Sequence, residues 1–224
     1  MLNKTLGSDK DGYNEVIAYL SEIKKPIKRQ VGRKKFIIYP NVFDPVFQDS
    51  QFLAKKLKFI IPKKSIVLDM GTGSGIQAIF AAEIASKVIA VDINPFAVKC
   101  ARENIKLNKL DNKITVKKSN LFENIKKEKF DVIIWNPPFY NRKPINILEK
   151  ACGDTDNKTL IKFIDSAKNF LNKNGFVLLV ISDSLDYVIF LDVLRKNNCQ
   201  LELIYSMFNK KNYHIVKIFY AKNK

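Results

Sequence analysis

The chain has few of the residues that build metal sites and cysteine-based catalytic sites. It contains three cysteines, Cys100, Cys152 and Cys199, which lie far apart and include no C-x-x-C pair, and a single histidine, His214. Zinc sites and Cys–His nucleophile pairs require other numbers and spacings of these residues. The sequence therefore predicts no metal site, and we expect the cysteines to fill space in the interior.

Long hydrophobic runs are also lacking. No apolar segment approaches the roughly 18 residues that a membrane-spanning helix needs. The first residues, MLNKTLGSDKDGYNE, lack the apolar stretch of a secretory signal. We therefore expect no membrane contact and a cytoplasmic location. Hydrophobic residues make up 46% and charged residues 27% of the 224 residues, which suits one globular domain with a short appendage.

Acidic residues are too few to balance the basic ones. Lysine and arginine number 39 against 22 aspartates and glutamates, which gives a formal net charge of +17. An excess of this size creates a long-range field that attracts nucleic acid and other polyanions. A biased genome also enriches lysine, but such a bias would raise glutamate alongside it. The charge therefore favours RNA or a ribosome-associated protein as the partner.

The chain divides into two parts of unequal size. We predict an N-terminal helix and basic connector over residues 1–38 and a single larger domain over residues 39–224. Apolar residues in YNEVIAYLSEIK, residues 13–24, recur at helical spacing. The segment KKPIKRQVGRKK is predicted to be the connector, and FIIYPNVFDP predicts a strand that leads into a loop.

From residue 66 onward, apolar strands alternate with amphipathic helices. Continuous apolar strands separated by helices indicate a parallel sheet that is covered on both faces. The last two apolar segments, QLELIYSMF and YHIVKIFYA, indicate a β-hairpin. We therefore predict an α/β, Rossmann-like fold with a seven-stranded, mostly parallel sheet, an antiparallel C-terminal hairpin and helices on both faces. Within it, we expect Ser50 to cap a helix over residues 50–60 and Gly175 to close a helix that starts at Leu160.

A glycine-rich loop follows the strand SIVLDM. Gly71, Gly73 and Gly75 allow the backbone to approach a ligand closely at the carboxyl end of that strand. Asp92 ends the next strand, about twenty residues further on, where a carboxylate accepts the hydroxyl hydrogens of a ribose. Asp69 precedes the glycines, and its charge would repel a pyrophosphate but favours a ligand with an amino group. Together these residues favour S-adenosylmethionine over a dinucleotide.

A second motif, Asn136-Pro137-Pro138-Phe139, follows the strand FDVIIW at the same edge of the sheet. The prolines fix the backbone, so that the Asn136 side chain and a main-chain carbonyl accept hydrogens from one –NH₂ group. That arrangement turns the nitrogen lone pair toward a methyl donor, and Phe139 can stack on a flat acceptor. By itself N-P-P is good turn chemistry. Beside the cofactor motifs, it predicts methyl transfer to a planar nitrogen.

These motifs resemble those of class I S-adenosylmethionine-dependent methyltransferases. LDMGTGSG is similar to the first motif of that family, and VDINPFAV is similar to its second. SNLFE looks like the segment whose acidic residue contacts the adenine amino group, and Asn120 stands at that position here. The similarity covers roughly residues 40–221. It implies S-adenosylmethionine as the cofactor, bound by Asp69, Gly71, Thr72, Gly73, Gly75, Asp92, Ile93, Asn120, Leu121 and Asn136.

The motif N-P-P-F looks like that of enzymes that methylate adenine N6, guanine N2 or glutamine side-chain amides. Release-factor glutamine methyltransferases typically carry tyrosine in the fourth place, whereas ribosomal-RNA enzymes of the small-domain type more often carry phenylalanine. Upstream, FDPVFQDS resembles the segment that covers the cofactor in both groups. The resemblance implies catalysis by Asn136, Pro137, Pro138 and Phe139, and we expect the substrate to contact Phe139, Tyr140, Arg142 and Lys143.

Several functions are compatible with these features. The favoured prediction is an N-methyltransferase that acts on a base amino group in ribosomal or transfer RNA. The first alternative is a HemK-like protein N5-glutamine methyltransferase acting on a release factor or a ribosome-associated protein. The second is a non-catalytic RNA-binding module of the same fold, against which the intact Asp69, Asp92 and Asn136 argue. The sequence leaves open the particular acceptor, the need for an activating protein subunit and the oligomeric state.

Overall fold

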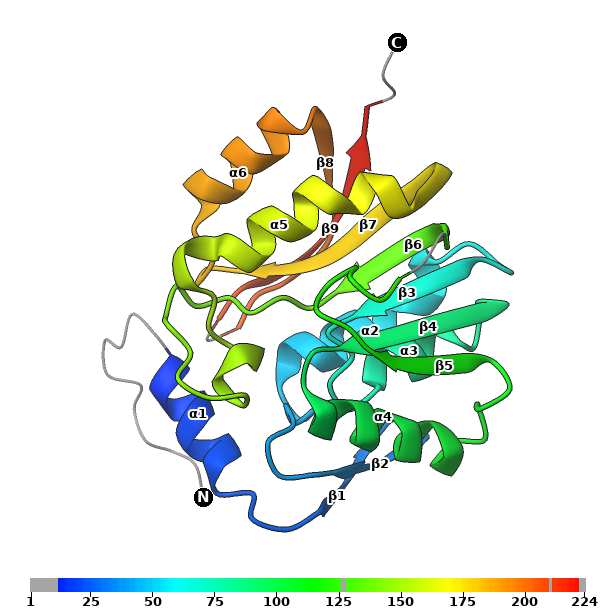
Figure 1. Cartoon of the computed structure of the whole chain (residues 1–224), viewed down its shortest axis with the longest axis vertical. Coiled ribbons are helices and arrows are strands. Elements are labelled where there is room, and N and C mark those ends of the chain that lie inside the picture. Colours follow the sequence, from blue (N-terminus) through cyan, green and yellow to red (C-terminus); the bar gives the residue numbers. More distant parts are fainter. Residues whose placement is uncertain (1–11, 126–127, 210, 222–224) are drawn as a thin grey trace.

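A seven-stranded sheet forms the centre of the computed structural model, which describes residues 12–125, 128–209 and 211–221 (Figure 1). The strand order is β5-β4-β3-β6-β7-β9-β8. Strands β3 to β7 run parallel, and β9 runs antiparallel between β7 and β8. This confirms the predicted fold class. The strands are β3 (Ile66–Met70), β4 (Lys87–Asp92), β5 (Ile114–Lys118), β6 (Phe130–Trp135), β7 (Leu171–Ser182), β8 (Cys199–Met207) and β9 (Tyr213–Tyr220).

Helices cover both faces of this sheet, because successive side chains of each buried strand point to opposite sides. Val67 and Val132 belong to the core that packs against α2, α3 and α4. Their neighbours Leu68 and Ile133 belong to the core that packs against α5 and α6. Burying one such side chain stabilises the fold by about 1.5–3 kcal/mol. The helices are α1 (Tyr13–Ser21), α2 (Gln48–Ile60), α3 (Ile76–Ala81), α4 (Pro95–Leu107), α5 (Lys158–Ala167) and α6 (Tyr187–Lys196), with short 3₁₀ turns η1 (Glu149–Ala151), η2 (Thr155–Asn157) and η3 (Lys168–Phe170).

The direction of strand addition reverses at β3. The chain builds β4 and β5 outward on one side of β3 and then returns to place β6 on its other side. In open parallel sheets, such a reversal leaves a crevice beyond the carboxyl ends of the strands, where ligands bind. The glycine-rich loop follows β3 and the N-P-P-F motif follows β6, so the topology brings both motifs to this crevice.

Local sequence sets the start of helix α4. The Asn94 side chain accepts a hydrogen bond from the Phe96 N–H at 2.9 Å, and Pro95 occupies the first helical position. Both features suit a helix N-terminus, where the first N–H groups have no partner within the helix. The helix then buries one stripe of small residues, including Ala97 and Ala101, against the sheet. The short spacing between β4 and α4 keeps Asp92 and Asn94 at the crevice.

The predicted basic connector contains a strand of its own. Strand β1 (Ile27–Val31) pairs antiparallel with β2 (Lys34–Ile38) to form a separate two-stranded ribbon. The sequence KKPIKRQVGRKK lacks a clear alternation of apolar and polar residues, and β1 is stabilised by pairing and tertiary contacts instead. Within the predicted N-terminal part, residues 1–38, the described residues thus form α1 and this ribbon. Residues 1–11 lie outside the described residues.

The expectation that Gly175 closes a helix is wrong. Helix α5 ends at Ala167, and β7 already begins at Leu171, so that Gly175 lies inside the strand. A Cβ atom at Gly175 would lie 2.7 Å from the Phe130 carbonyl oxygen. The glycine therefore permits close approach of β6 and β7, a strand role that the sequence does not distinguish from a helix end.

The expectation that Ser50 caps a helix is also wrong. Helix α2 starts two residues earlier, at Gln48, and its N-cap residue Phe47 provides no side-chain hydrogen bond. Ser50 is buried within the first turn, and its hydroxyl accepts a hydrogen bond from Asn136. The Ser50 side chain thus binds Asn136 in the crevice and does not cap the helix.

None of the helices in residues 12–125, 128–209 and 211–221 is long and apolar enough to cross a membrane. The same residues contain no group of three or more histidine, cysteine, aspartate or glutamate side chains placed to hold a metal ion. Cys100 and Cys152 are buried free thiols and Cys199 is half-buried. Their burial agrees with a space-filling role.

Candidate active site

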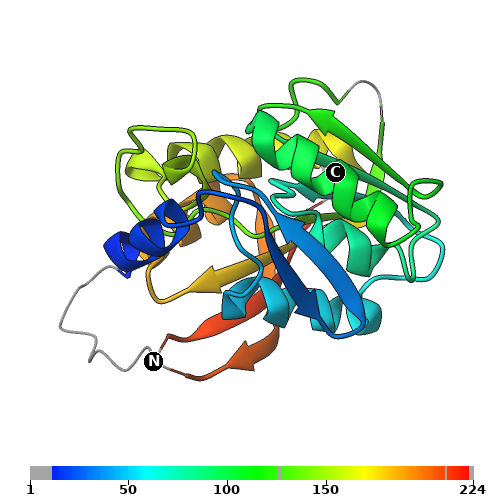
Figure 2. The same cartoon turned by 90° about the horizontal axis from the view of Figure 1, so that it is seen from below.

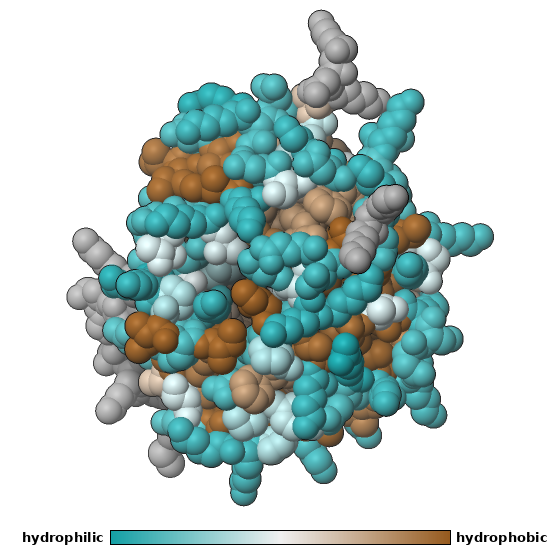
Figure 3. Space-filling view, in the orientation of Figure 1, coloured by the Kyte–Doolittle hydropathy of each residue, from teal (hydrophilic) through white to brown (hydrophobic). Residues whose placement is uncertain are grey.

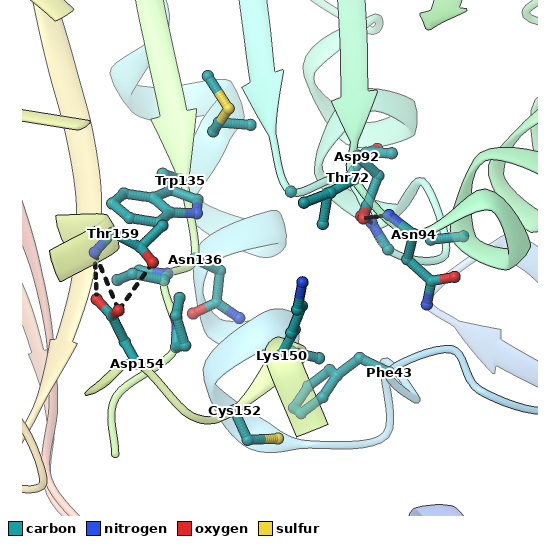
Figure 4. Close-up of a pocket in the computed structure, with 18 of the residues that line it drawn as sticks. Phe43, Thr72, Asp92, Asn94, Trp135, Asn136, Lys150, Cys152, Asp154 and Thr159 are labelled. Atoms are coloured by element: carbon teal, nitrogen blue, oxygen red, sulfur yellow. Dashed lines mark hydrogen bonds between the residues drawn. The ribbon is translucent and has the colours of Figure 1, made fainter. Parts of the chain in front are cut away.

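A cavity of about 460 Å³ opens beyond the carboxyl ends of β3, β4 and β6 (Figure 4). Four segments that are far apart in the sequence meet there: the glycine-rich loop, the end of β4, the segment after β5 and the N-P-P-F motif. The wall also includes residues 43–50 before and within α2, residues 144–159 after the motif, Val16 of α1 and Tyr213 of β9. The predicted site residues that line it are Gly71, Thr72, Gly73, Asp92, Ile93, Asn120, Leu121, Asn136, Pro137, Pro138, Phe139 and Tyr140.

The three loop glycines have different surroundings, although all three have positive φ angles. A Cβ atom at Gly73 would have no atom nearer than the Gly71 carbonyl oxygen at 4.0 Å, so this position opens onto the cavity. At Gly71 a Cβ atom would lie 3.3 Å from the Trp135 indole nitrogen. At Gly75 it would lie 3.3 Å from Ala101 of α4. Gly73 therefore permits close approach of a ligand, whereas Gly75 permits close packing of the loop on α4.

Asp69 holds the glycine-rich loop from the side away from the cavity. Its carboxylate accepts hydrogen bonds from the Thr72 hydroxyl at 2.6 Å and from the Ala78 N–H at 3.0 Å. Burial raises the pKa of Asp69 to about 7, and these two hydrogen bonds oppose the rise. Asp69 is not among the residues that line the cavity. It therefore fixes the loop and the start of α3, and its predicted contact with an amino group of the ligand stays a prediction.

Asp92 is the carboxylate that lines the cavity at the end of β4. One oxygen accepts a hydrogen bond from the Gly73 N–H at 2.9 Å, and the other accepts one from the Asn94 N–H at 2.8 Å. Burial raises the pKa of Asp92 above its ordinary value, while the backbone hydrogen bonds act in the opposite direction. Each oxygen keeps a further lone pair for a ligand. The arrangement suits two neighbouring hydroxyl groups.

The segment after β5 forms the next part of the wall. Leu121 lines the cavity with a positive φ of 48°, which turns the chain sharply beside Asn120. The Asn120 side-chain N–H₂ donates to Glu123 at 2.7 Å. Its carbonyl oxygen is therefore the group that Asn120 can offer to a ligand's amino group.

Asn136 has a fixed orientation. Its side-chain N–H₂ group donates to the Asp49 carboxylate at 2.8 Å and to the Ser50 hydroxyl at 3.2 Å, so both amide hydrogens have acceptors. Its carbonyl oxygen is buried and has no hydrogen-bond partner among the described residues. Figure 4 shows the side chain at the cavity. Asn136 therefore presents an acceptor only, and a group that binds to it must donate a hydrogen.

Asp49 is a functional candidate that the sequence reasoning missed. The resemblance of FDPVFQDS to a cofactor-covering segment gives Asp49 no role of its own. The side chain is 4% exposed, and burial raises its pKa even though Asn136 donates to it. A carboxylate two residues into a helix has no signal that points to an asparagine 87 positions away. Only the packing of α2 beside β6 brings Asp49 to Asn136.

The two aromatic residues of the substrate side are partly covered by other parts of the chain. Phe139 lies with its ring centre 6.4 Å from that of Tyr213, and both line the cavity. The Tyr140 hydroxyl accepts a hydrogen bond from Lys211 at 2.8 Å, and its ring meets the edge of Tyr13 of α1. The predicted contacts Arg142 and Lys143 do not line the cavity and stay predictions.

The segment after Tyr140 is held in place by Glu149, another residue that the sequence reasoning missed. Its carboxylate accepts hydrogen bonds from the Tyr13 hydroxyl at 3.0 Å, the Ile145 N–H at 2.9 Å and the Asn146 side chain at 2.8 Å. The next residue, Lys150, points its ammonium group into the cavity (Figure 4). Helix α1 thus helps to fix the substrate side of the cavity, and Lys150 adds a positive charge to it.

This geometry can be compared with known families. The sequence model of the methyltransferase small domain family matches residues 34–216, which include every segment of the cavity wall except α1. The chain belongs to the methyltransferase small domain family. This confirms the predicted family and the predicted class of enzyme.

Two of the curated relatives have the names of protein methyltransferases. A putative protein N5-glutamine methyltransferase of Methanocaldococcus jannaschii is 39% identical over 153 residues, which are 65% of this chain and 75% of the relative. A ribosomal protein L11 methyltransferase of Alkaliphilus oremlandii is 33% identical over 144 residues, which are 63% of this chain and 40% of the relative. The chain thus spans about two fifths of the length of that second relative.

Solved structures of methyltransferases share the fold. A T. thermophilus 16S rRNA N2 methyltransferase in complex with AdoMet and guanosine superposes with a TM-score of 0.66 at 19% identity, over 86% of this chain and 49% of the other. A ribosomal protein L11 methylase of Lactobacillus delbrueckii gives a TM-score of 0.62 at 24% identity, over 87% of this chain and 99% of the other. At these identities, the similarity supports the Rossmann-like methyltransferase fold alone.

Proposed function

We propose that this methyltransferase transfers a methyl group from S-adenosylmethionine to a planar nitrogen, namely a base amino group of ribosomal or transfer RNA. The observation that carries the proposal is the orientation of Asn136. Asp49 and Ser50 accept both of its amide hydrogens, so that only its carbonyl oxygen is left for a substrate. Such a site selects an acceptor that carries N–H bonds.

The residues at the β3 and β4 end of the cavity fit S-adenosylmethionine. Asp92 keeps lone pairs for the two ribose hydroxyls, the Asn120 carbonyl suits the adenine amino group, and the open side of Gly73 leaves room for the ligand. When bound, the cofactor supplies an activated methyl group on a sulfonium. The role of the glycine-rich loop is to keep side chains away from that part of the cavity.

The residues at the β6 end would orient the acceptor. Asn136 accepts one hydrogen of the –NH₂ group, and the backbone held by Pro137 and Pro138 offers a carbonyl to the other. With both hydrogens held in the plane of the acceptor, the nitrogen lone pair lies perpendicular to that plane and faces the methyl group, and it leaves conjugation as the new N–C bond forms. Phe139 and Tyr213 exclude water beside the flat group. No strong base is needed, since the proton leaves after transfer.

A protein glutamine is the second candidate acceptor. A glutamine side-chain amide has the same –NH₂ group, and the name of the Methanocaldococcus jannaschii relative favours it. The net charge of +17 and the phenylalanine of N-P-P-F favour RNA. A non-catalytic module is disfavoured because Asp92, Asn136 and the glycine-rich loop are all kept at one cavity.

The test is methyl transfer from labelled S-adenosylmethionine to total RNA and total protein from a strain that lacks the gene. Nucleoside and amino-acid analysis of the labelled fraction then identifies the acceptor. We expect label in an N-methylated nucleoside. Label in N5-methylglutamine instead would replace the RNA proposal with the glutamine alternative, and label in neither fraction would contradict the enzymatic proposal.

A further inference from the structure

The ribbon of β1 and β2 is the most basic segment of the chain. No acidic residue occurs between Ile23 and Phe43. We call residues 24–38 the basic ribbon. Its cationic residues are Lys24, Lys25, Lys28, Arg29, Arg33, Lys34 and Lys35.

Two of these cations form ion pairs with other residues of the chain. Arg29 donates to the Asp44 carboxylate at 2.9 Å, and Lys34 pairs with Glu83 at 3.1 Å. The other five are exposed, and their side chains make no ion pair with the residues that the structure describes. These five are Lys24, Lys25, Lys28, Arg33 and Lys35. Five uncompensated positive charges on so short a ribbon repel one another, and a polyanion would relieve that repulsion.

The basic ribbon is held rigidly on α4. The buried Asn104 side chain accepts from the Ile37 N–H at 2.7 Å and donates to the Ile37 carbonyl at 3.0 Å. Asn108 accepts from the Lys35 N–H at 3.3 Å and donates to its carbonyl at 2.8 Å. These two amide side chains thus form the hydrogen bonds to the backbone of β2 that a neighbouring strand would form. The charges of the ribbon therefore have fixed positions before any partner binds, which reduces the entropy lost on binding.

Helix α4 carries three further cations. Lys99 lies over the ring of Tyr39, the residue after β2, and Arg102 donates to the Val116 carbonyl of β5 at 3.0 Å. Lys99, Arg102 and Lys106 are exposed and are spaced three or four residues apart, so they share one face of the helix. Glu103 lies among these cations and accepts a hydrogen bond from the Tyr39 hydroxyl, so this part of α4 carries three cations and one carboxylate. Figure 2 shows the ribbon beside α4, and in Figure 3 hydrophilic side chains project along the lower rim of the molecule, where both lie.

This charged surface is joined directly to the rim of the active-site cavity. The chain enters the ribbon from α1, where Val16 lines the cavity, and leaves it toward Phe43, which also lines the cavity. Arg29 of β1 connects α1 to the segment that follows β2. It donates to the Tyr19 hydroxyl of α1 at 2.7 Å and to the Asp44 carboxylate at 2.9 Å. A polymer that leaves the cavity between Val16 and Phe43 would run toward the base of the ribbon.

We infer that the basic ribbon and the exposed face of α4 bind the phosphate backbone of the RNA strand that flanks the target nucleotide. The inference rests on the proposed function and names the surface that docks its substrate. Lysine and arginine side chains without base-reading neighbours contact phosphates irrespective of sequence, and each contact releases condensed counterions. The ribbon thus contributes affinity and position, while the cavity selects the nucleotide.

The test replaces three ribbon cations together, Lys28→Gln, Arg33→Gln and Lys35→Gln, and measures binding to a 30-nucleotide RNA across salt concentrations. The matched control makes the same change of charge on the opposite side of the molecule. Its substitutions are Lys168→Gln, Lys173→Gln and Lys196→Gln, all at exposed positions. Thermal unfolding and S-adenosylmethionine titration of both variants check that the fold and the cofactor end are intact.

We expect the ribbon variant to bind RNA at least about tenfold more weakly at low salt. The slope of log K against log salt should fall by about 2, because each phosphate contact on a single strand contributes about 0.7. The control variant should bind nearly as the unmodified chain does. Equal binding by the ribbon variant and the unmodified chain, or an equal loss in both variants, would overturn the inference.

The same variants separate this inference from the proposed function. Binding is measured without methyl transfer, so a chain that methylates no RNA still gives a readable result for the ribbon. A ribbon variant that keeps RNA affinity but loses capture of an acidic polypeptide would also overturn the inference, because the surface would then serve a protein partner. RNA binding that depends on the ribbon in a chain that methylates only glutamine would support the docking surface and contradict the RNA acceptor.

Discussion

At the scale of single residues, the active site depends on which hydrogen-bonding group each side chain presents. Asn136 would be ambiguous by itself, because an amide can donate and accept. Asp49 and Ser50 remove the ambiguity by accepting both of its hydrogens. Asp92 is constrained in the same way by the Gly73 and Asn94 N–H groups. Each key group therefore has a neighbour that sets its orientation.

Replacing Asn136 by alanine tests its catalytic role. The variant loses the acceptor that orients the substrate nitrogen, an interaction that belongs to the reacting geometry. We expect turnover to fall by at least about a hundredfold, the scale of one preorganised polar contact. Cofactor affinity should change much less, because Asp92 and the loop lie at the other end of the cavity. Single-turnover methyl transfer and cofactor titration measure both quantities, and normal turnover would mean that N-P-P-F is only a turn.

The variant Asn136→Asp sharpens the same prediction. Its carboxyl group would lie beside Asp49, and two neighbouring carboxylates cannot both stay charged in a buried site. A proton shared between them restores the hydrogen bond and leaves an oxygen for the substrate. We therefore expect partial activity that rises as the pH falls from 8 to 6. A pH-independent rate in this variant would contradict the proposed role of Asp49.

Replacing Asp92 by alanine tests the cofactor end. The carboxylate is proposed to accept hydrogen bonds from the ribose hydroxyls, and charge-assisted bonds of this kind contribute about 1.5–3 kcal/mol. S-adenosylmethionine binding should weaken by that amount, which is roughly tenfold to more than a hundredfold. Calorimetric titration measures the change. Unchanged affinity in a folded variant would remove Asp92 from the cofactor site.

At the scale of elements, the glycine-rich loop illustrates that similar residues have separate functions. Gly71, Gly73 and Gly75 all adopt positive φ, but only Gly73 opens freely onto the cavity. Gly75 lies against Ala101 of α4. The loop thus leaves room for a ligand on one side and packs on a helix on the other.

The pair Gly73→Ala and Gly75→Ala separates these two functions. Both substitutions place a side chain at positive φ, which costs about 1–2 kcal/mol. Gly73→Ala should reduce cofactor affinity strongly, since its methyl group enters the cavity. Gly75→Ala should lower the unfolding temperature further, because its methyl group meets Ala101, and it should affect cofactor affinity less. Calorimetry and thermal unfolding distinguish the two, and the opposite ranking would show that Gly73 is not at the ligand.

At the scale of the whole molecule, three carboxyl groups in and beside the crevice have raised pKa values. Burial raises the pKa of Asp49, Asp69 and Asp92, and that of Asp69 reaches about 7. A carboxyl group with a raised pKa in the folded state binds its proton more tightly there than in the unfolded chain. It therefore stabilises the fold at low pH and loses this contribution as the pH rises.

Stability should accordingly decrease between pH 4 and pH 7. Asp69 has an ordinary pKa of 3.8 and a folded one of about 7, so in this window the folded state holds one more proton. The free energy of unfolding should fall by up to about 1.4 kcal/mol per pH unit. Asp69→Asn keeps an oxygen for Thr72 and Ala78 but cannot titrate, so its stability should vary less with pH. Urea denaturation at several pH values measures this, and parallel curves for both proteins would contradict it.

The sequence by itself determined the order of elements and the two motifs of the site. Apolar strands such as VIAVD need burial on both faces, so their alternation with helices already implies the parallel sheet. The positions of Gly71 and Asn136 could be predicted because each follows a parallel strand directly. The residues that follow such strands lie at the carboxyl edge of the sheet. Asn94 and Pro95 marked the start of α4 through local chemistry alone.

The tertiary structure alone decided which groups meet across long sequence separations. Asp49 reaches Asn136, Tyr13 reaches Glu149 and Asn104 reaches the backbone of Ile37. Gly175 had the local appearance of a helix end, but the approach of β6 decided its place in a strand. No local pattern encodes these contacts, because hydrogen bonds and packing between distant segments depend on where the folded sheet places them. The order and connection of the helices and strands could therefore be predicted from the sequence, whereas the orientation of the Asn136 side chain could not.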